Sequence, residues 1–102
     1  MSQYVISDEA IEDLDRISEY FLKTNVEAGE QFIQAFNTKC QQLVSFPKLG
    51  RSYSHIRSDV CGISLRGFII LYQTSGESET LDIDILRVVS GRRDLNSIFS
   101  TD

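Results

Sequence analysis

Apolar side chains recur at helical spacing near the start of the chain. The first stripe consists of Ala10, Leu14, Ile17 and Phe21. These positions follow i, i+4, i+7 and i+11, which predicts a helix with one apolar face. Ser7 stands where its N-cap belongs, and Asp8 and Glu9 follow in the first turn, where carboxylates interact favourably with the helix dipole. The side expected to face water carries Glu12, Asp13, Asp15, Arg16 and Glu19.

A second helix is expected after a very short break. Thr24-Asn25-Val26-Glu27 has the pattern of a capping box, with a hydroxyl residue at the N-cap and a glutamate three residues later. Its apolar stripe is formed by Phe32, Phe36, Cys40 and Leu43. Pro47 forbids continuation of this helix, because proline lacks the backbone N–H and restricts the preceding residue. Two helices joined by so short a turn must lie antiparallel, as a hairpin.

The remaining apolar positions predict strands. A short β-like run at Gln3–Ile6 precedes the first helix. Val60–Leu65 and Phe68–Gln73 are separated by Arg66-Gly67, which predicts a β-hairpin. The last strand is expected at Leu81–Val89, since its first half alternates apolar and acidic residues.

The predicted order β-α-α-β-β-β indicates a two-layer α+β fold, in which the helical hairpin packs on one face of an antiparallel-rich, four-stranded sheet. Lys48–Asp59 is expected to be a polar loop, and a short C-terminal helical turn is expected around Leu95, Ile98 and Phe99. The 102 residues are interpreted as a single domain, residues 1–102. The second face of the sheet is then left open, and Leu86 and Val88 are expected to point there.

Composition narrows the class of protein. Apolar residues make up 41% and charged residues 25% of the chain, which is typical of a globular domain. No apolar run is long enough to cross a bilayer and no leader-like segment is visible, so we expect a cytoplasmic protein with no direct membrane contact. Two cysteines and one histidine are too few for a structural zinc site, so we expect reduced, buried thiols, no metal and no cofactor.

The net charge of −5 makes the chain a poor candidate for binding bare nucleic acid, and we expect no sequence-specific DNA binding by the chain alone. A local arginine patch would be required for such binding. The segment Ile85–Leu95 carries Arg87, Arg92 and Arg93 around a predicted strand end. Crowded guanidinium groups repel one another, so they usually meet an acidic group, a phosphate or a polar partner.

The alternatives for these arginines stay open at this point. Arg92 and Arg93 could be neutralised by Asp94 or other nearby carboxylates, although surface pairs contribute only about 0–1 kcal/mol. Arg87 falls on the apolar side of the predicted strand unless a bulge turns it. An arginine in that place requires either an internal ion pair or a partner surface.

At these residues the chain resembles the ParE/RelE superfamily of small bacterial toxins from toxin–antitoxin modules, and within it the ParE-like branch. The resemblance runs from Tyr4 to Phe99. The sequences that carry it are Asp13-Leu14-x-x-Ile17-x-x-Tyr20, Phe46-Pro47-x-Leu49-Gly50-Arg51, Tyr72 at the end of a strand, and Ile85-Leu86-Arg87-Val88-Val89-Ser90-Gly91-Arg92-Arg93-Asp94-Leu95.

The resemblance implies a toxin of a type II module, of the plasmid-stabilization kind, that inhibits DNA gyrase and is neutralised by a ParD-like antitoxin. Gyrase contacts are expected from Arg87, Arg92 and Arg93. Antitoxin contacts are expected from Leu86, Val88 and Arg66. The acidic side of the first helix is read as solvated, with docking of a basic antitoxin as the alternative.

The same resemblance leaves a ribosome-dependent mRNA endoribonuclease of the RelE kind as an alternative. Its site residues would be Arg51, Arg66, Tyr72 and Arg92. Ser90 stands where many relatives have histidine, and arginines are poor acid–base groups at neutral pH, which argues against the nuclease. His55 and Arg57 are interpreted as solvated loop residues. A further alternative is a binding module of the same fold that has lost toxicity.

Overall fold

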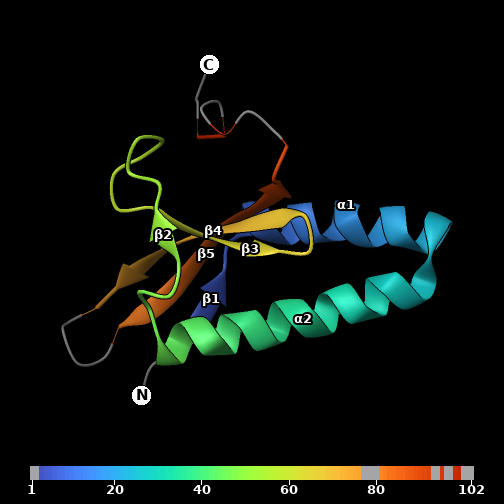
Figure 1. The fold of residues 1–102 in the computed structure, drawn as a ribbon, viewed down its shortest axis with the longest axis horizontal. Helices are drawn as coiled ribbons and strands as arrows, with labels where there is room; N and C mark the ends of the chain where they lie inside the picture. The colour runs from blue at the N-terminus through green and yellow to red at the C-terminus, as the bar shows by residue number, and fades with distance from the viewer. Residues whose placement is uncertain (1–2, 77–80, 93–94, 96–97, 100–102) are drawn as a thin grey trace.

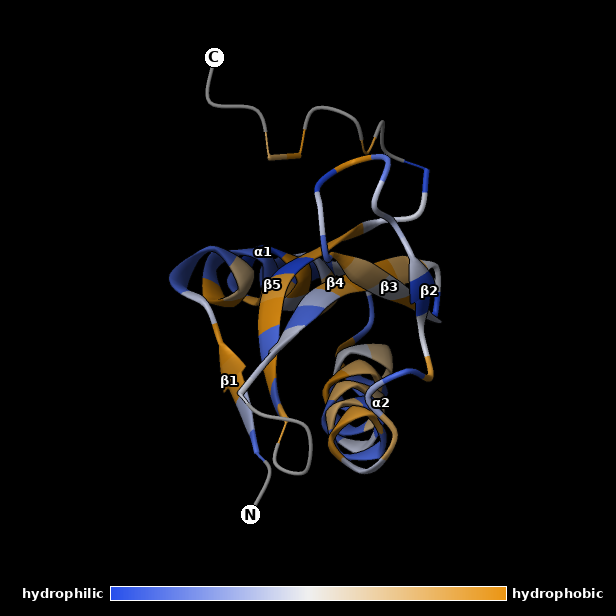
Figure 2. Ribbon diagram, turned by 90° about the vertical axis from the view of Figure 1, so that its left-hand side faces the viewer, coloured by the Kyte–Doolittle hydropathy of each residue, from blue (hydrophilic) through white to orange (hydrophobic). Residues whose placement is uncertain are grey.

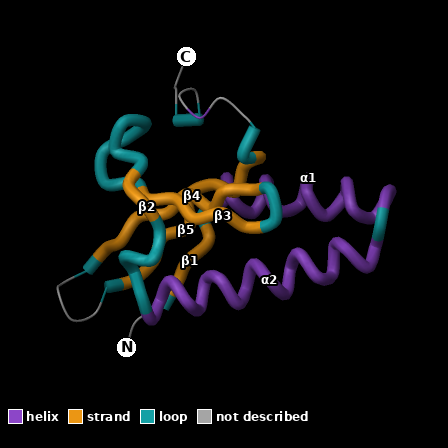
Figure 3. The backbone as a smooth tube through the Cα atoms, in the orientation of Figure 1, coloured by secondary structure: helices purple, strands orange, loops and turns teal. Residues whose placement is uncertain are grey.

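The computed structural model describes residues 3–76, 81–92, 95 and 98–99 of the chain. Two helices, α1 (Asp8–Thr24) and α2 (Val26–Ser45), follow the first strand, β1 (Tyr4–Ile6). Four strands come after them in the chain, namely β2 (Arg51–Ser52), β3 (Cys61–Leu65), β4 (Phe68–Ser75) and β5 (Asp82–Ser90). The helical hairpin and the sheet form two layers, and the closed end of the hairpin projects beyond the sheet (Figures 1 and 3). The predicted α+β fold is confirmed.

The sheet has five strands in the order β1-β5-β4-β3-β2, rather than the four expected. The additional strand, β2, pairs only Arg51 with Gly62 and Ser52 with Cys61. Two residues are too few to show the alternation by which a strand is recognised in a sequence. β1 runs parallel to β5, with Tyr4 opposite Ile83 and Ile6 opposite Ile85. The other neighbouring strands are antiparallel.

Local chemistry explains the ends of both helices. The Ser7 hydroxyl accepts a hydrogen bond from the backbone N–H of Ala10, as expected for the N-cap of α1. The N-cap of α2 is Asn25, whose side chain accepts from the N–H of Ala28, so the predicted capping box starting at Thr24 is wrong by one residue. Thr24 still belongs to α1, and its hydroxyl donates to the carbonyl of Tyr20. Because Thr24 completes the last turn of α1, it has helical backbone angles and cannot serve as the N-cap of α2. The next residue, Asn25, takes that position.

The main core lies between the helical hairpin and one face of the sheet. Both predicted apolar stripes supply it, and its central side chains are less than 2% exposed: Phe32, Cys40, Leu43, Ile70, Tyr72, Ile83 and Ile85. Burial raises the pKa of the Cys40 thiol to about 12, so this thiol stays protonated and unreactive at neutral pH.

A second apolar cluster covers the opposite face of the sheet, which the sequence analysis expected to be open. It contains Tyr53, Val60, Leu71, Val89 and Ile98. The loop between β2 and β3 and the described part of the C-terminal segment lie on this side, across the sheet from α2 (Figure 2). The expected packing of the C-terminal segment is confirmed for Ile98, which is 7% exposed.

A β-bulge in β5 decides which side chains face which cluster. Leu71 pairs with Arg87 and Tyr72 pairs with Ile85, so Leu86 is the extra residue. The bulge resets the alternation, and Val88 joins Ile83 and Ile85 in the main core, where it is 2% exposed. The predicted orientation of Val88 is therefore wrong, whereas Leu86 is half-buried against the second cluster.

Tyr72 anchors the segment that follows α2. Its ring is fully buried, and its hydroxyl donates to the carbonyl of Pro47 at 2.9 Å and accepts from the N–H of Gly50 at 3.0 Å. Burial raises the pKa of this hydroxyl, which is thereby held in its neutral, donating form. The side chain thus holds the start of β2 beside β3 and β4.

Replacement of Tyr72 by phenylalanine is expected to destabilise the protein by about 1–3 kcal/mol, because the N–H of Gly50 and the carbonyl of Pro47 lose a buried partner. Urea denaturation followed by circular dichroism measures this change. Tyr20→Phe is the matched control, since Tyr20 is 61% exposed, and its stability should be unchanged. Equal midpoints for Tyr72→Phe and the wild type would contradict this role.

Candidate functional site

Asp13 of α1 is the buried charged residue at the centre of the candidate site. It is 4% exposed, although the helical pattern placed it on the side facing water. Its Oδ2 accepts hydrogen bonds from Nε of Arg87 at 2.7 Å and from the backbone N–H of Val88 at 2.9 Å. Its Oδ1 accepts from the guanidinium groups of Arg87 at 2.9 Å and Arg16 at 2.6 Å. The carboxylate is therefore fully engaged by donors from α1 and β5.

Arg87 is held inside the molecule by this carboxylate. The two hydrogen bonds to Asp13 raise the pKa of Arg87, and its side chain is 15% exposed. A third contact joins Nη1 of Arg87 to the backbone carbonyl of Ile98 at 3.4 Å. Of the two roles left open for Arg87, the structure shows the internal ion pair, and the guanidinium links α1, β5 and the C-terminal segment.

The ion pair between Asp13 and Arg87 lies at a part of β5 where the strand edge is not paired with β1. β1 pairs with β5 only as far as Ile85, so none of the described strands lies beside the backbone of residues 86–90 on that side. The start of α1 takes the place of a strand. The Ser7 hydroxyl donates to the carbonyl of Leu86 at 2.9 Å, and Asp13 accepts from the N–H of Val88. An unpaired strand edge is a template for aggregation, and these two side chains cap it.

The end of β5 presents the remaining arginines. Gly91 donates its N–H to the carbonyl of Gly67, and the Ser90 hydroxyl accepts from the N–H of Arg92 at 3.2 Å. Arg92 is exposed, and within the described ranges no carboxylate lies within 4 Å of its side chain. Arg93 and Asp94 lie outside the described residues. The Arg92 side chain is thus exposed, whereas the Arg87 guanidinium is bonded to Asp13.

The four residues named for the ribonuclease alternative lie in two places. Arg51 of β2 and Tyr72 of β4 lie on either side of the start of β3, where Arg51 pairs with Gly62 and Tyr72 with Cys61. Arg66 is exposed in the β3–β4 turn, with φ of 48°, and Arg92 is near the same turn. The length of β3 separates the two pairs by roughly 13 Å. Because the Tyr72 hydroxyl is also buried and bonded, these residues do not converge on one phosphate.

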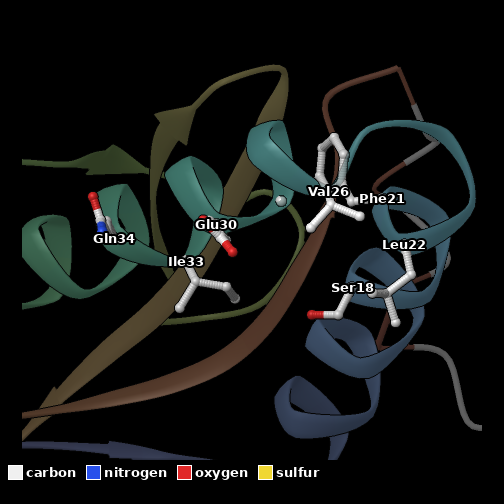
Figure 4. Close-up of a pocket in the computed structure, with 8 residues that line it drawn as sticks. Ser18, Phe21, Leu22, Val26, Glu30, Ile33 and Gln34 are labelled. Atoms are coloured by element: carbon white, nitrogen blue, oxygen red, sulfur yellow. The ribbon is translucent and has the colours of Figure 1, made fainter.

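A groove between the two helices is a surface that the sequence analysis missed. It encloses about 480 Å³ and is lined by Ser18, Phe21 and Leu22 of α1 and by Val26, Gly29, Glu30, Ile33 and Gln34 of α2. Figure 4 shows Leu22, Val26 and Ile33 pointing into the space between the helices. Their exposed fractions are 68%, 53% and 37%. Leu22 follows Ser18 by four residues and Ile33 follows Glu30 by three, and this helical spacing was the signal that the sequence offered.

The described part of the chain has neither a candidate metal centre nor a candidate membrane-spanning helix. No group of three or more His, Cys, Asp or Glu there is placed to hold a metal ion. Neither described helix is long and apolar enough to cross a membrane.

Comparisons with known proteins agree with this geometry. The family described as "ParE toxin of type II toxin-antitoxin system, parDE" matches residues 4–95. Toxin ParE3 of Caulobacter vibrioides is 31% identical over 84 residues, which cover 81% of this chain and 80% of that protein.

Two solved structures share the fold. A chain of the "Chromosomal ParDE TA system from P. aeruginosa" superposes with a TM-score of 0.70 at 20% identity, covering 88% of this chain and 95% of that one. The "YoeB/ParE toxin from Agrobacterium tumefaciens" superposes with a TM-score of 0.63 at 12% identity, covering 88% and 98% of the two chains.

Asp13→Asn is expected to lower the free energy of unfolding by about 3–5 kcal/mol, because it leaves the Arg87 guanidinium inside the protein without a counter-ion. Equilibrium urea denaturation gives the value. Glu12→Gln removes a neighbouring exposed carboxylate and should change stability by no more than about 0.5 kcal/mol. Similar losses in the two variants would show that Asp13 acts only through the overall charge of α1.

Proposed function

Because the chain belongs to the ParE toxin family of type II toxin–antitoxin systems, we propose that it inhibits DNA gyrase and is silenced by a cognate ParD-like antitoxin. The family match carries this proposal, since it includes the whole of β5 and the arginines that follow it. The protein acts by binding rather than by proton transfer, and its site of action is the cytoplasm, where gyrase is found.

The exposed arginines after β5 make the contact with gyrase in this proposal. Arg92 is exposed and has no carboxylate nearby among the described residues, and Arg93 follows it in the sequence. Arg87 has a different role, because its guanidinium is occupied by Asp13. It holds β5 against α1 and so positions the end of the strand from which the other two arginines emerge.

The antitoxin docks in the groove between α1 and α2. The groove floor is apolar, with Leu22, Val26 and Ile33 exposed on it, and Glu30 lies in its lining. Asp15 and Glu19 are exposed on α1, two turns and one turn before Leu22, and share its side of the helix. An acidic rim around an apolar floor fits an amphipathic helix with Lys or Arg beside its apolar face. Leu86 and Arg66 remain predicted antitoxin contacts.

The purified chain is expected to inhibit gyrase supercoiling of a relaxed plasmid and to accumulate cleaved DNA. The double variant Arg92→Gln/Arg93→Gln should require at least about tenfold more protein, the equivalent of about 1.4 kcal/mol of binding. Lys23→Gln/Lys39→Gln is the matched control, because it changes net charge equally on the helical hairpin. Its potency should equal that of the wild type.

A chain that does not affect gyrase at large molar excess would contradict this proposal. Mapping of mRNA ends after induction then tests the ribonuclease alternative. If cells keep growing after the chain is induced, the remaining alternative is a binding module of the same fold that has lost toxicity.

Leu22→Glu is expected to weaken antitoxin binding by about tenfold or more, because it places a carboxylate on the apolar floor of the groove. Its thermal stability should not fall, since Leu22 is 68% exposed. Isothermal titration with the antitoxin encoded beside this gene measures the affinity. Leu49→Glu is the control, because Leu49 is 49% exposed at a distant surface. Equal affinities for the wild type and Leu22→Glu would exclude the groove as the docking site.

A further inference from the structure

The loop between β2 and β3 concentrates positive charge in an otherwise acidic protein. Together with β2 and the residues just before it, the segment from residue 48 to residue 57 carries Lys48, Arg51, His55 and Arg57, and the sequence contains no acid there until Asp59. Arg57 and His55 are predicted from the sequence to be solvated loop residues. Both are exposed, as expected, and the structure in addition places the side chains of Arg51, His55 and Arg57 against two aromatic rings.

Tyr53 organises the first part of this cluster. Its ring is 5% exposed and packs against Gly62, where a Cβ would lie only 2.5 Å from Cε1 of Tyr53. Nε and Nη2 of Arg51 donate to the Tyr53 hydroxyl at 3.3 and 3.1 Å. The His55 ring stacks on Tyr53 with 5.7 Å between centroids and 30° between planes. The guanidinium and the imidazole are thus both held against one buried ring.

Arg57 completes the cluster through a contact with the C-terminal segment. Its guanidinium carbon lies 4.8 Å from the centroid of the Phe99 ring. The loop backbone is folded on itself, since Tyr53 donates its N–H to the carbonyl of Val60 at 2.8 Å and Ile56 donates to Tyr53 at 2.9 Å. Arg51, His55 and Arg57 are nonetheless exposed. Within the described ranges no carboxylate lies within 4 Å of either guanidinium.

We propose that residues 51–57 form a contact site for a single-stranded nucleic acid. Arg51 and Arg57 bind phosphates, and the open side of the His55 ring stacks on a base. Guanidinium groups beside an exposed planar ring are the combination that binds such strands without reading their sequence. The exposed hydroxyls of Ser52 and Ser54 add donors for phosphate oxygens. An acidic peptide would engage the arginines but would leave the stacked ring unused.

This site lies outside the antitoxin groove and involves neither Arg92 nor Arg93. Nucleic-acid binding at residues 51–57 goes beyond the proposed inhibition of gyrase, and each of the two activities is independent of the other.

The test uses the full chain and an oligothymidylate of about twelve nucleotides at about 20 mM salt. Fluorescence anisotropy measures affinity, and proton NMR follows the His55 ring, which gives the only imidazole signals because the chain has one histidine. We expect the oligonucleotide to shift these signals. Two phosphate contacts predict an affinity loss of roughly 25-fold when salt rises tenfold.

The triple variant Arg51→Gln/His55→Ala/Arg57→Gln should bind at least tenfold more weakly, whereas the equally charged Lys23→Gln/Lys39→Gln control should retain wild-type affinity. Unmoved His55 signals in the wild-type chain at saturation would overturn the proposal, whether or not the triple variant folds. So would equal losses in the two variants. Tighter binding of a polyglutamate peptide of the same length would overturn it in favour of a protein partner. Gyrase inhibition, assayed separately, is independent of these outcomes.

Discussion

The ion pair between Asp13 and Arg87 is the interaction on which the arrangement of this protein depends. Its two partners lie 74 residues apart in the chain, one on α1 and the other on β5. A carboxylate that is 4% exposed is tolerated inside a protein only when its oxygens are bonded, and here four donor contacts reach them. Such a pair contributes little net stability compared with apolar side chains of the same size. Its importance lies in position, because no other register of α1 along β5 brings Asp13 to both the guanidinium and the N–H of Val88.

Several features follow from that register. The bulge at Leu86 lets Arg87 reach Asp13 while Val88 enters the main core, so the ion pair and the packing of β5 require each other. The start of α1 caps the part of β5 that β1 leaves without a neighbour. The Arg87 contact with the carbonyl of Ile98 extends the same link to the second cluster. The three partner surfaces that we propose lie outside this network: Arg92 after β5, the groove between the helices, and residues 51–57.

Much of this fold could be predicted from local patterns, and much of the site could not. The apolar stripes, the Ser7 cap, Pro47 and the Arg66-Gly67 turn act within a few residues, and each predicted its element correctly. Asp13 was misread because its place on the polar side of α1 is correct for an isolated helix, and only the edge of β5 makes that place buried. The direction of Val88 was misread because a bulge depends on pairing with β4. The burial of Tyr53 in this polar loop could not be predicted, because its fit against Gly62 joins the loop after β2 to a residue of β3.

A double-mutant cycle between Asp13→Asn and Arg87→Gln, measured by urea denaturation, tests the central claim most directly. If the two side chains form one buried unit, removing the second costs little once the first is gone. The double variant should then be more stable than the sum of the single losses implies, with a coupling energy of about 2–3 kcal/mol. Losses that add to within about 0.5 kcal/mol would show that the two residues act independently, and would contradict the account.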